Sequence, residues 1–163
     1  MLDIGCGFNC QPGFVGMDKR KVDGVQIQHD VENLPWPLGD ETCAVLVMSH
    51  LIEHIKPWLQ IDVLNEAWRI LEVGGILALS TPYATSFGFF QDPTHCAPWN
   101  EATVEYFCAG TALFEVYRPR PWMLDVGPDQ RPKFFYSTRG NLEVVYKKLT
   151  VEEGERMRNH GKK

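Results

Sequence analysis

Glycines and carboxylates recur where the chain passes from an apolar run into a turn. Gly5 and Gly7 follow the first apolar run, Asp18 follows the second, and Asp30 follows the third. Glycines allow a backbone to pass close to a ligand, and a carboxylate can accept hydrogen bonds from both hydroxyls of a ribose. The set therefore favours an adenosine-containing ligand, with Asp18 at the ribose and Asp30 at the adenine amino group.

Histidines supply the candidate acid–base groups. His50 follows the fourth apolar run, and His95 lies in a long loop rich in aromatic residues. Histidine titrates near neutral pH, so both residues are candidate catalytic bases. The run from His50 to His54, His-Leu-Ile-Glu-His, also matches an inverted zinc-peptidase motif through His50, Glu53 and His54. That motif requires a helix and a third ligand. Here an apolar run that predicts a buried strand precedes it, so a zinc hydrolase is only a distant alternative.

Short apolar runs and one amphipathic stretch predict the elements that position these residues. Continuous or alternating apolar runs predict strands at residues 1–4, 14–17, 25–29, 43–48 and 75–80, the fourth of them buried on both faces. A helix is predicted from Pro57, ending at Gly74 and Gly75. Its core-facing stripe is Ile61, Leu64, Ala67, Trp68 and Leu71. Strands separated by crossovers predict a parallel sheet whose carboxyl ends meet at one edge, where α/β folds bind ligands.

The second half of the chain is less regular. Residues 81–98 have no periodicity, and a loop of this length in a compact domain is usually functional. Asn100 is expected to cap a short helix that runs to Cys108. Residues 113–149 predict two extended segments around a turn at residues 127–129. We expect a single domain over residues 1–149 and a polar, flexible tail over 150–163.

Composition is that of an ordinary soluble globular protein. The 163 residues are 44% hydrophobic and 23% charged, with a net charge of −5. This balance disfavours a whole-surface attraction to nucleic acid or to an anionic membrane, and no apolar run has the length of a membrane span. The five cysteines are odd in number and none forms a Cys-x-x-Cys pair. We therefore expect reduced thiols in a cytoplasmic protein.

Four ordered motifs resemble those of class I methyltransferases that use S-adenosyl-L-methionine (SAM), and in particular the type 11 subgroup. Residues 2–7, Leu-Asp-Ile-Gly-Cys-Gly, resemble the first motif of the class. Residues 29–37, beginning His-Asp-Val-Glu, resemble the adenine-side motif. Residues 47–55 and 69–77 are similar to the motifs on strand four and on the approach to strand five.

The resemblance implies a Rossmann-like α/β fold, a mostly parallel sheet with a C-terminal antiparallel hairpin, SAM as cofactor and no metal. Gly5 and Gly7 would pass beneath the methionine part of SAM, and Asp3 would orient this loop or meet the methionine ammonium. Asp18 would hold the ribose. The remaining positions implied at the cofactor are Cys6, Asp30, Val31 and Ser49, with His50 facing it from strand four. The methyl acceptor would be a small molecule or a macromolecule, which the sequence does not identify.

Two features depart from the resemblance. Only ten residues separate Gly7 from Asp18, so the first helix of the family cannot fit, and a loop through residues 8–12 must replace it, leaving one sheet face thinly covered. Ala44 stands where an acidic residue is common. These departures keep open the alternative that the protein is not an enzyme but a non-catalytic SAM-binding module or a degenerate methyltransferase-fold module. A nicotinamide-dependent oxidoreductase is disfavoured, because Cys10 takes the place of the third glycine and Asp18 comes too early.

Overall fold

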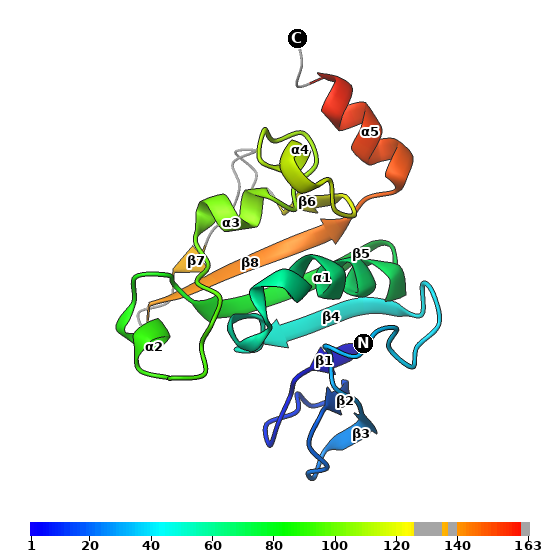
Figure 1. Ribbon diagram of the computed structural model, residues 1–163. Helices are drawn as coiled ribbons and strands as arrows, with labels where there is room; N and C mark the ends of the chain where they lie inside the picture. Colours follow the sequence, from blue (N-terminus) through cyan, green and yellow to red (C-terminus); the bar gives the residue numbers. More distant parts are fainter. Residues whose placement is uncertain (126–134, 137–139, 161–163) are drawn as a thin grey trace.

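A mostly parallel sheet forms the centre of the protein. The computed structural model describes residues 1–125, 135–136 and 140–160. Seven strands lie in the order β3-β2-β1-β4-β5-β8-β6, and the short β7 pairs with β8 (Figure 1). β1 to β5 are parallel, whereas β8 runs antiparallel to β5, β6 and β7. The strands are β1 (Leu2–Ile4), β2 (Val15–Asp18), β3 (Val25–Gln28), β4 (Cys43–Ser49), β5 (Leu71–Pro82), β6 (Trp122–Leu124), β7 (Phe135–Tyr136) and β8 (Asn141–Lys148).

Short helices occupy the connections of the sheet. The only described helices with more than five residues are α1 and α5. The α-helices are α1 (Gln60–Ile70), α2 (Phe87–Phe90), α3 (Glu101–Glu105), α4 (Phe114–Tyr117) and α5 (Val151–His160), and two 3₁₀ turns, η1 (Ile52–His54) and η2 (Pro57–Leu59), precede α1. None of the described helices combines the length and the apolar character needed to cross a membrane.

The helix predicted before β5 is confirmed, but its end was placed wrongly. Val63, Leu64, Ala67 and Ile70 of α1 are buried in the core shared with the sheet. The helix ends at Ile70, and Leu71 already has the extended conformation of β5. Cys43 pairs with Leu71, and the register shifts before Val45 pairs with Ile76. The glycines that follow therefore lie within this irregular part of the strand and do not end the helix.

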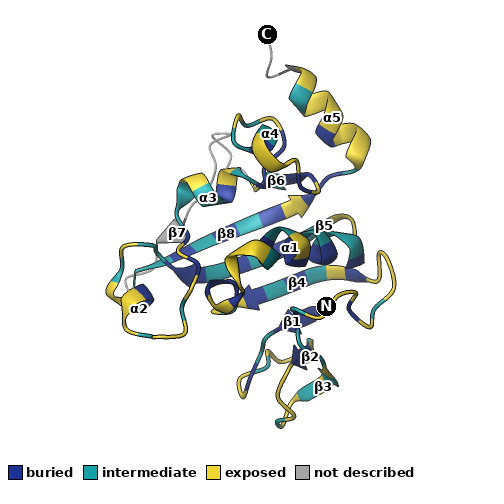
Figure 2. Ribbon diagram, viewed as in Figure 1, coloured by how far each residue is buried: buried dark blue, intermediate teal, exposed yellow. Residues whose placement is uncertain are grey.

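One face of the sheet is only partly covered, as the short connection after β1 predicted. Residues 5–14 contain turns but no helix. Along β4, Leu46 and Met48 are buried, whereas Val45 and Val47 are half-buried. β8 alternates in the same way (Figure 2). The expectation that residues 43–48 are buried on both faces is therefore wrong, since Val45 and Val47 stay half-buried and none of the described helices lies in the connection after β1.

The C-terminal third differs in part from the prediction. Asn100 caps α3 as expected, accepting a hydrogen bond from the Thr103 backbone at 3.1 Å, but the helix ends at Glu105 and does not reach Cys108. The extended segment expected from residue 113 begins instead with α4, and the turn expected at residues 127–129 lies outside the described residues.

The antiparallel end of the sheet is confirmed by the pairing of β8 with β5 and β6. Residues 150–163 were expected to form a flexible tail, yet Val151–His160 form α5, mostly exposed in Figure 2. Arg158 of this helix forms an ion pair with Glu115 of α4 at 2.5 Å. The domain boundary at residue 149 stays a prediction.

A buried carboxylate ties the segment before β4 to α1. Glu66 Oε1 accepts hydrogen bonds from the Trp36 backbone N–H at 2.7 Å and from Arg69 Nη2 at 2.6 Å. The hydrogen bonds from Arg69 and Trp36 outweigh the opposing effect of burial and lower the pKa of Glu66 from its ordinary value of 4.5. The ionised form of Glu66 therefore stabilises the folded state.

We expect Glu66→Gln to reduce the free energy of unfolding by about 1–2 kcal/mol at pH 7, because it removes a charge-assisted hydrogen bond. Since folding lowers this pKa, the contribution is complete above pH 4.5 and is lost as the pH falls through the folded-state pKa. Urea unfolding at a series of pH values should show the difference between wild type and variant shrinking below about pH 4.5. The exposed Glu72→Gln is the control; a constant difference at all pH values would contradict the assignment.

Candidate functional site

The loop after β1 has the conformation that its glycines permit. Gly5 and Gly7 have positive φ angles of 70° and 56°. The Gly5 backbone N–H donates to Met17 of β2 at 2.7 Å. A side chain added at Gly5 would meet Leu51 carbon atoms at 2.8 Å, and one at Gly7 would meet the Arg20 guanidinium at the same distance. Both positions therefore favour glycine for conformation, because other residues rarely adopt a positive φ.

Asp18, at the end of β2, fixes this loop. Its Oδ2 accepts a hydrogen bond from the Gly7 backbone N–H at 2.9 Å, and its Oδ1 accepts from the backbone N–H and Nε of Arg20 at 2.8 and 3.1 Å. Burial alone would raise the pKa of Asp18, but the hydrogen bonds from Arg20 and Gly7 outweigh it and hold the pKa below its ordinary value. The carboxylate is therefore ionised at neutral pH and partly covered by Arg20.

A cavity of about 640 Å³ opens between the ends of β1, β2 and β4. We call it the glycine-loop cavity. It brings together five of the predicted site residues: Gly5, Asp18, Asp30, Val31 and His50. The other residues that line it are Lys19, Arg20, Glu32, Leu51, His54, Ile55, Lys56 and Thr94. The carboxylates predicted for ribose and adenine thus share one cavity with the first glycine.

An ion pair closes one wall of this cavity. Glu32 accepts hydrogen bonds from the backbone N–H of Lys56 at 2.9 Å and from its ammonium at 2.5 Å. Burial opposes ionisation of Glu32, but these contacts prevail and lower its pKa. The segment that carries Asp30 and Val31 is thereby held against the turn before α1.

Four of the predicted cofactor residues do not line the cavity. The buried Asp3 accepts a hydrogen bond from the Gln11 backbone at 2.8 Å, and burial raises the pKa of its carboxyl. This contact joins Asp3 to the loop after β1, and the two roles expected for Asp3 stay predictions. Gly7 acts through its contact with Asp18. Ser49 is exposed at the end of β4, and Cys6 is bonded to Cys10.

The expectation of five reduced thiols is contradicted at this disulfide. Cys6 and Cys10 are joined, with Cα atoms 4.6 Å apart, and the free cysteines are Cys43, Cys96 and Cys108. Both sulfur atoms pack against the position where a Gly16 side chain would stand. The loop that replaces the first helix of the family is thus cross-linked, a constraint that the odd cysteine count concealed.

The disulfide predicts the result of a thiol count. Alkylation of the unfolded chain without reductant should modify the three free cysteines, and alkylation after reduction should modify all five. Mass spectrometry of the intact protein distinguishes the two states. Five modified cysteines before reduction would mean that the Cys6–Cys10 bond does not persist in the purified protein.

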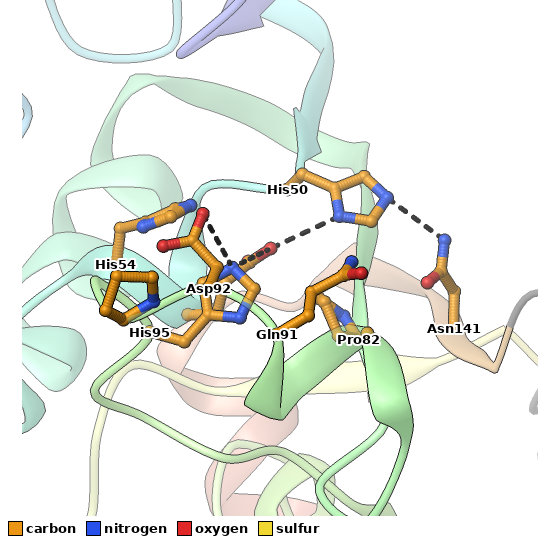
Figure 3. Close-up of a pocket in the computed structure, with 10 residues that line it drawn as sticks. His50, His54, Pro82, Gln91, Asp92, His95 and Asn141 are labelled. Carbon is orange, nitrogen blue, oxygen red and sulfur yellow. Dashed lines mark hydrogen bonds and ion pairs between the residues drawn. The ribbon is translucent and has the colours of Figure 1, made fainter.

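A second cavity, also of about 640 Å³, adjoins the first. We call it the histidine cavity; His50 and His54 line both. Its remaining lining residues are Glu53, Pro82, Gly88, Gln91, Asp92, Pro93, His95 and Asn141 (Figure 3). Residues from the end of β4, the loop after β5 and the start of β8 meet here. The two candidate bases, His50 and His95, therefore share one cavity.

Glu53 is the buried centre of this group. His50 Nδ1 lies 3.3 Å from Glu53 Oε1, and His95 Nε2 lies 4.0 Å from the same oxygen. The contact with Glu53 raises the pKa of His50. The sequence placed Glu53 in the zinc-peptidase motif and in the strand-four motif of residues 47–55, and named it as a candidate ligand only in the first. His50 precedes η1 with a φ of 52°, so the motif lacks the helix that a peptidase needs.

The comparisons with known proteins agree with this geometry. Residues 6–79 match the type 11 family model described as a methyltransferase domain. A probable SAM-dependent methyltransferase of Mycolicibacterium smegmatis is 29% identical over 138 residues, which cover 71% of this chain and 52% of the relative. The chain therefore spans about half the length of this curated relative.

Solved structures share the fold at low sequence identity. A SAM-dependent methyltransferase from Archaeoglobus fulgidus has a TM-score of 0.63 at 17% identity, covering 90% of this chain and 85% of its own. A protein of Thermotoga maritima, described as a possible histamine N-methyltransferase, has a TM-score of 0.62 at 18% identity, covering 90% and 81%. The protein has the Rossmann-like methyltransferase fold. Over residues 6–79 the chain is similar to the type 11 SAM-dependent methyltransferases.

Proposed function

We propose that this protein is an enzyme that binds SAM in the glycine-loop cavity and transfers its methyl group to an acceptor in the histidine cavity. The observation that carries the proposal is the convergence of Gly5, Asp18, Asp30 and Val31 on one cavity at the carboxyl ends of parallel strands. Ligands of open α/β sheets bind at this edge. The similarity to the methyltransferase domain over residues 6–79 makes SAM the ligand to test first.

The residues present fit an adenosyl ligand. Gly5 lines the cavity without a side chain of its own, and the ionised Asp18 lies in the same cavity. Asp30 and the largely buried Val31 supply a polar and an apolar neighbour for a base. Bound there, SAM would supply a methyl group on a positively charged sulfur, which is already a strong electrophile.

The chain's own contribution would be to align the acceptor. His50 and His54 lie at the junction of the two cavities, so an acceptor in the histidine cavity would be next to a cofactor in the other. Holding two reactants in line can lower a barrier by several kcal/mol. His50 and His95 remain our candidates for holding or removing an acceptor proton.

Calorimetric titration with SAM and with its demethylated product tests the proposal. We expect saturable binding of both at one site per chain. An acceptor screen on the same preparation then separates an enzyme from a non-catalytic SAM-binding module, since only an enzyme converts SAM to the demethylated product. Absence of binding by either compound would refute the assignment. A cytoplasmic location also stays a proposal, and a disulfide that persists in the purified protein would argue against it.

A further inference from the structure

An unpaired carboxylate oxygen lies at the floor of the histidine cavity. Glu53 has no solvent exposure, and its Oε2 accepts a hydrogen bond from Thr81 Oγ1 at 3.1 Å. Its Oε1 has no hydrogen-bond partner, because His50 Nδ1, at 3.3 Å, is not aligned for one. A buried carboxylate oxygen without an aligned hydrogen bond costs free energy, and the half-exposed His50 ring compensates this one only in part. A positively charged partner in the cavity would remove that cost.

His95 presents a free ring nitrogen to the same oxygen. Its Nδ1 lies 2.8 Å from the Phe89 carbonyl oxygen, which can only accept, so Nδ1 carries the proton. Its Nε2 then holds a lone pair, 4.0 Å from Glu53 Oε1 and 3.9 Å from Asp92 Oδ2 (Figure 3). Two carboxylate oxygens thus lie near this lone pair, and the nearest ring nitrogen to Glu53 Oε1 is His50 Nδ1, at 3.3 Å.

A hydrogen bond at Nδ1 also orients the ring of His54, as the contact with Phe89 does for His95. Its Nδ1 lies 2.9 Å from Thr94 Oγ1, and that hydroxyl donates its proton to Asp92 Oδ1 at 2.7 Å. The hydroxyl must therefore accept from Nδ1–H, which leaves the other nitrogen of His54 free to bind a cation. Histidines that bind metals usually have their second nitrogen held in this way by a carbonyl or carboxylate network.

We propose that Glu53, His54 and His95 bind a divalent transition-metal cation in the histidine cavity. One ligand atom from each residue lies within 4.8 Å of the other two. Ligand atoms of a tetrahedral cation with bonds of about 2.0–2.2 Å are about 3.3–3.6 Å apart, so the three side chains must move together by about 1 Å to reach coordination distance. Two histidines and one carboxylate are a donor set typical of zinc and iron sites.

The proposed cation replaces the sequence-based expectation of a metal-free site. Three protein ligands leave coordination positions open, and the cavity gives access to them. An acceptor would bind there through an oxygen atom, such as a hydroxyl or carboxylate group. This assignment of the acceptor class rests on the proposed function, whereas the cation site itself does not.

Metal titration of the full chain tests the site. Tag-free protein dialysed against a chelator is titrated with Zn²⁺ by calorimetry and with Co²⁺ by visible absorption. We expect one equivalent of either ion, with Co²⁺ bands that report histidine ligation. Glu53→Gln and His54→Ala should weaken binding at least about tenfold. His54 is exposed, so its removal leaves the core intact if the Glu53 variant does not fold.

Glu72→Gln, on an exposed residue of β5, is the matched control and should bind like wild type. Absence of one-to-one binding, or equal affinity in wild type and both ligand variants, would overturn the proposal. SAM titration of the same samples separates the two hypotheses. SAM binding without metal binding refutes the cation site alone, and metal binding without SAM binding refutes the proposed function alone.

Discussion

Replacing Asp18 with asparagine is expected to weaken SAM binding by about tenfold to a hundredfold, because hydrogen bonds to charged groups contribute about 1.5–3 kcal/mol each. The side chain lies in the glycine-loop cavity and is ionised. It also holds the Gly7 backbone, so the substitution removes a ligand contact and loosens the loop. Calorimetric titration of wild type and variant with SAM measures the effect.

Asp62→Asn on the exposed face of α1 is the control for this experiment and should leave the affinity unchanged. Thermal unfolding of Asp18→Asn distinguishes lost binding from lost folding. Unchanged SAM affinity in a folded variant would remove Asp18 from the site and, with it, the main support for an adenosyl ligand.

Replacing Trp99 with alanine is expected to lower the free energy of unfolding by about 3–5 kcal/mol, which is usual for a large aromatic residue in a core. Trp99 has no solvent exposure and stacks on Phe107 with ring centroids 5.6 Å apart. Its Nε1 donates to Gln60 Oε1 of α1 at 3.1 Å. The loop that carries His95 ends at this residue, so its removal should also weaken metal binding.

Trp58→Ala is the matched control, because Trp58 is 74% exposed in the turn before α1. Urea unfolding of the two variants should show a large effect at Trp99 and a small one at Trp58. Equal effects would mean that Trp99 does not anchor the loop after β5 to the helix.

The five parallel strands and the main helix could be predicted because each leaves a local pattern in the sequence. Apolar runs gave all five parallel strands, and the stripe through Leu64 and Ala67 gave α1. The end of α1 was missed because Leu71 enters the sheet by pairing with Cys43, a contact between distant residues that no local signal carries. The partial cover of the second sheet face could also be predicted, because the ten residues between Gly7 and Asp18 are too few to form a covering helix.

The sequence predicted which site residues meet where those residues follow parallel strands. It did not predict the contacts that depend on how the loops fold. Gly5, Asp18 and Asp30 meet because parallel strands end at one edge. His95 reaches Glu53 only through the fold of the loop after β5, so the sequence separated the two residues into unrelated hypotheses. The Cys6–Cys10 bond was missed because five cysteines without a metal-like spacing favoured free thiols.

The position of β8 constrains how the protein can be made. β8 is the last strand in the described chain, yet it lies between β5 and β6 in the sheet. During synthesis, the backbone N–H and C=O groups on the β8 side of β5 have no strand to pair with until β8, which ends at Lys148, has left the ribosome. An unpaired strand edge of this kind invites association between nascent chains. Slow synthesis or premature termination before β8 should therefore yield aggregates, and shortened versions that lack β8 should not be obtained in native form.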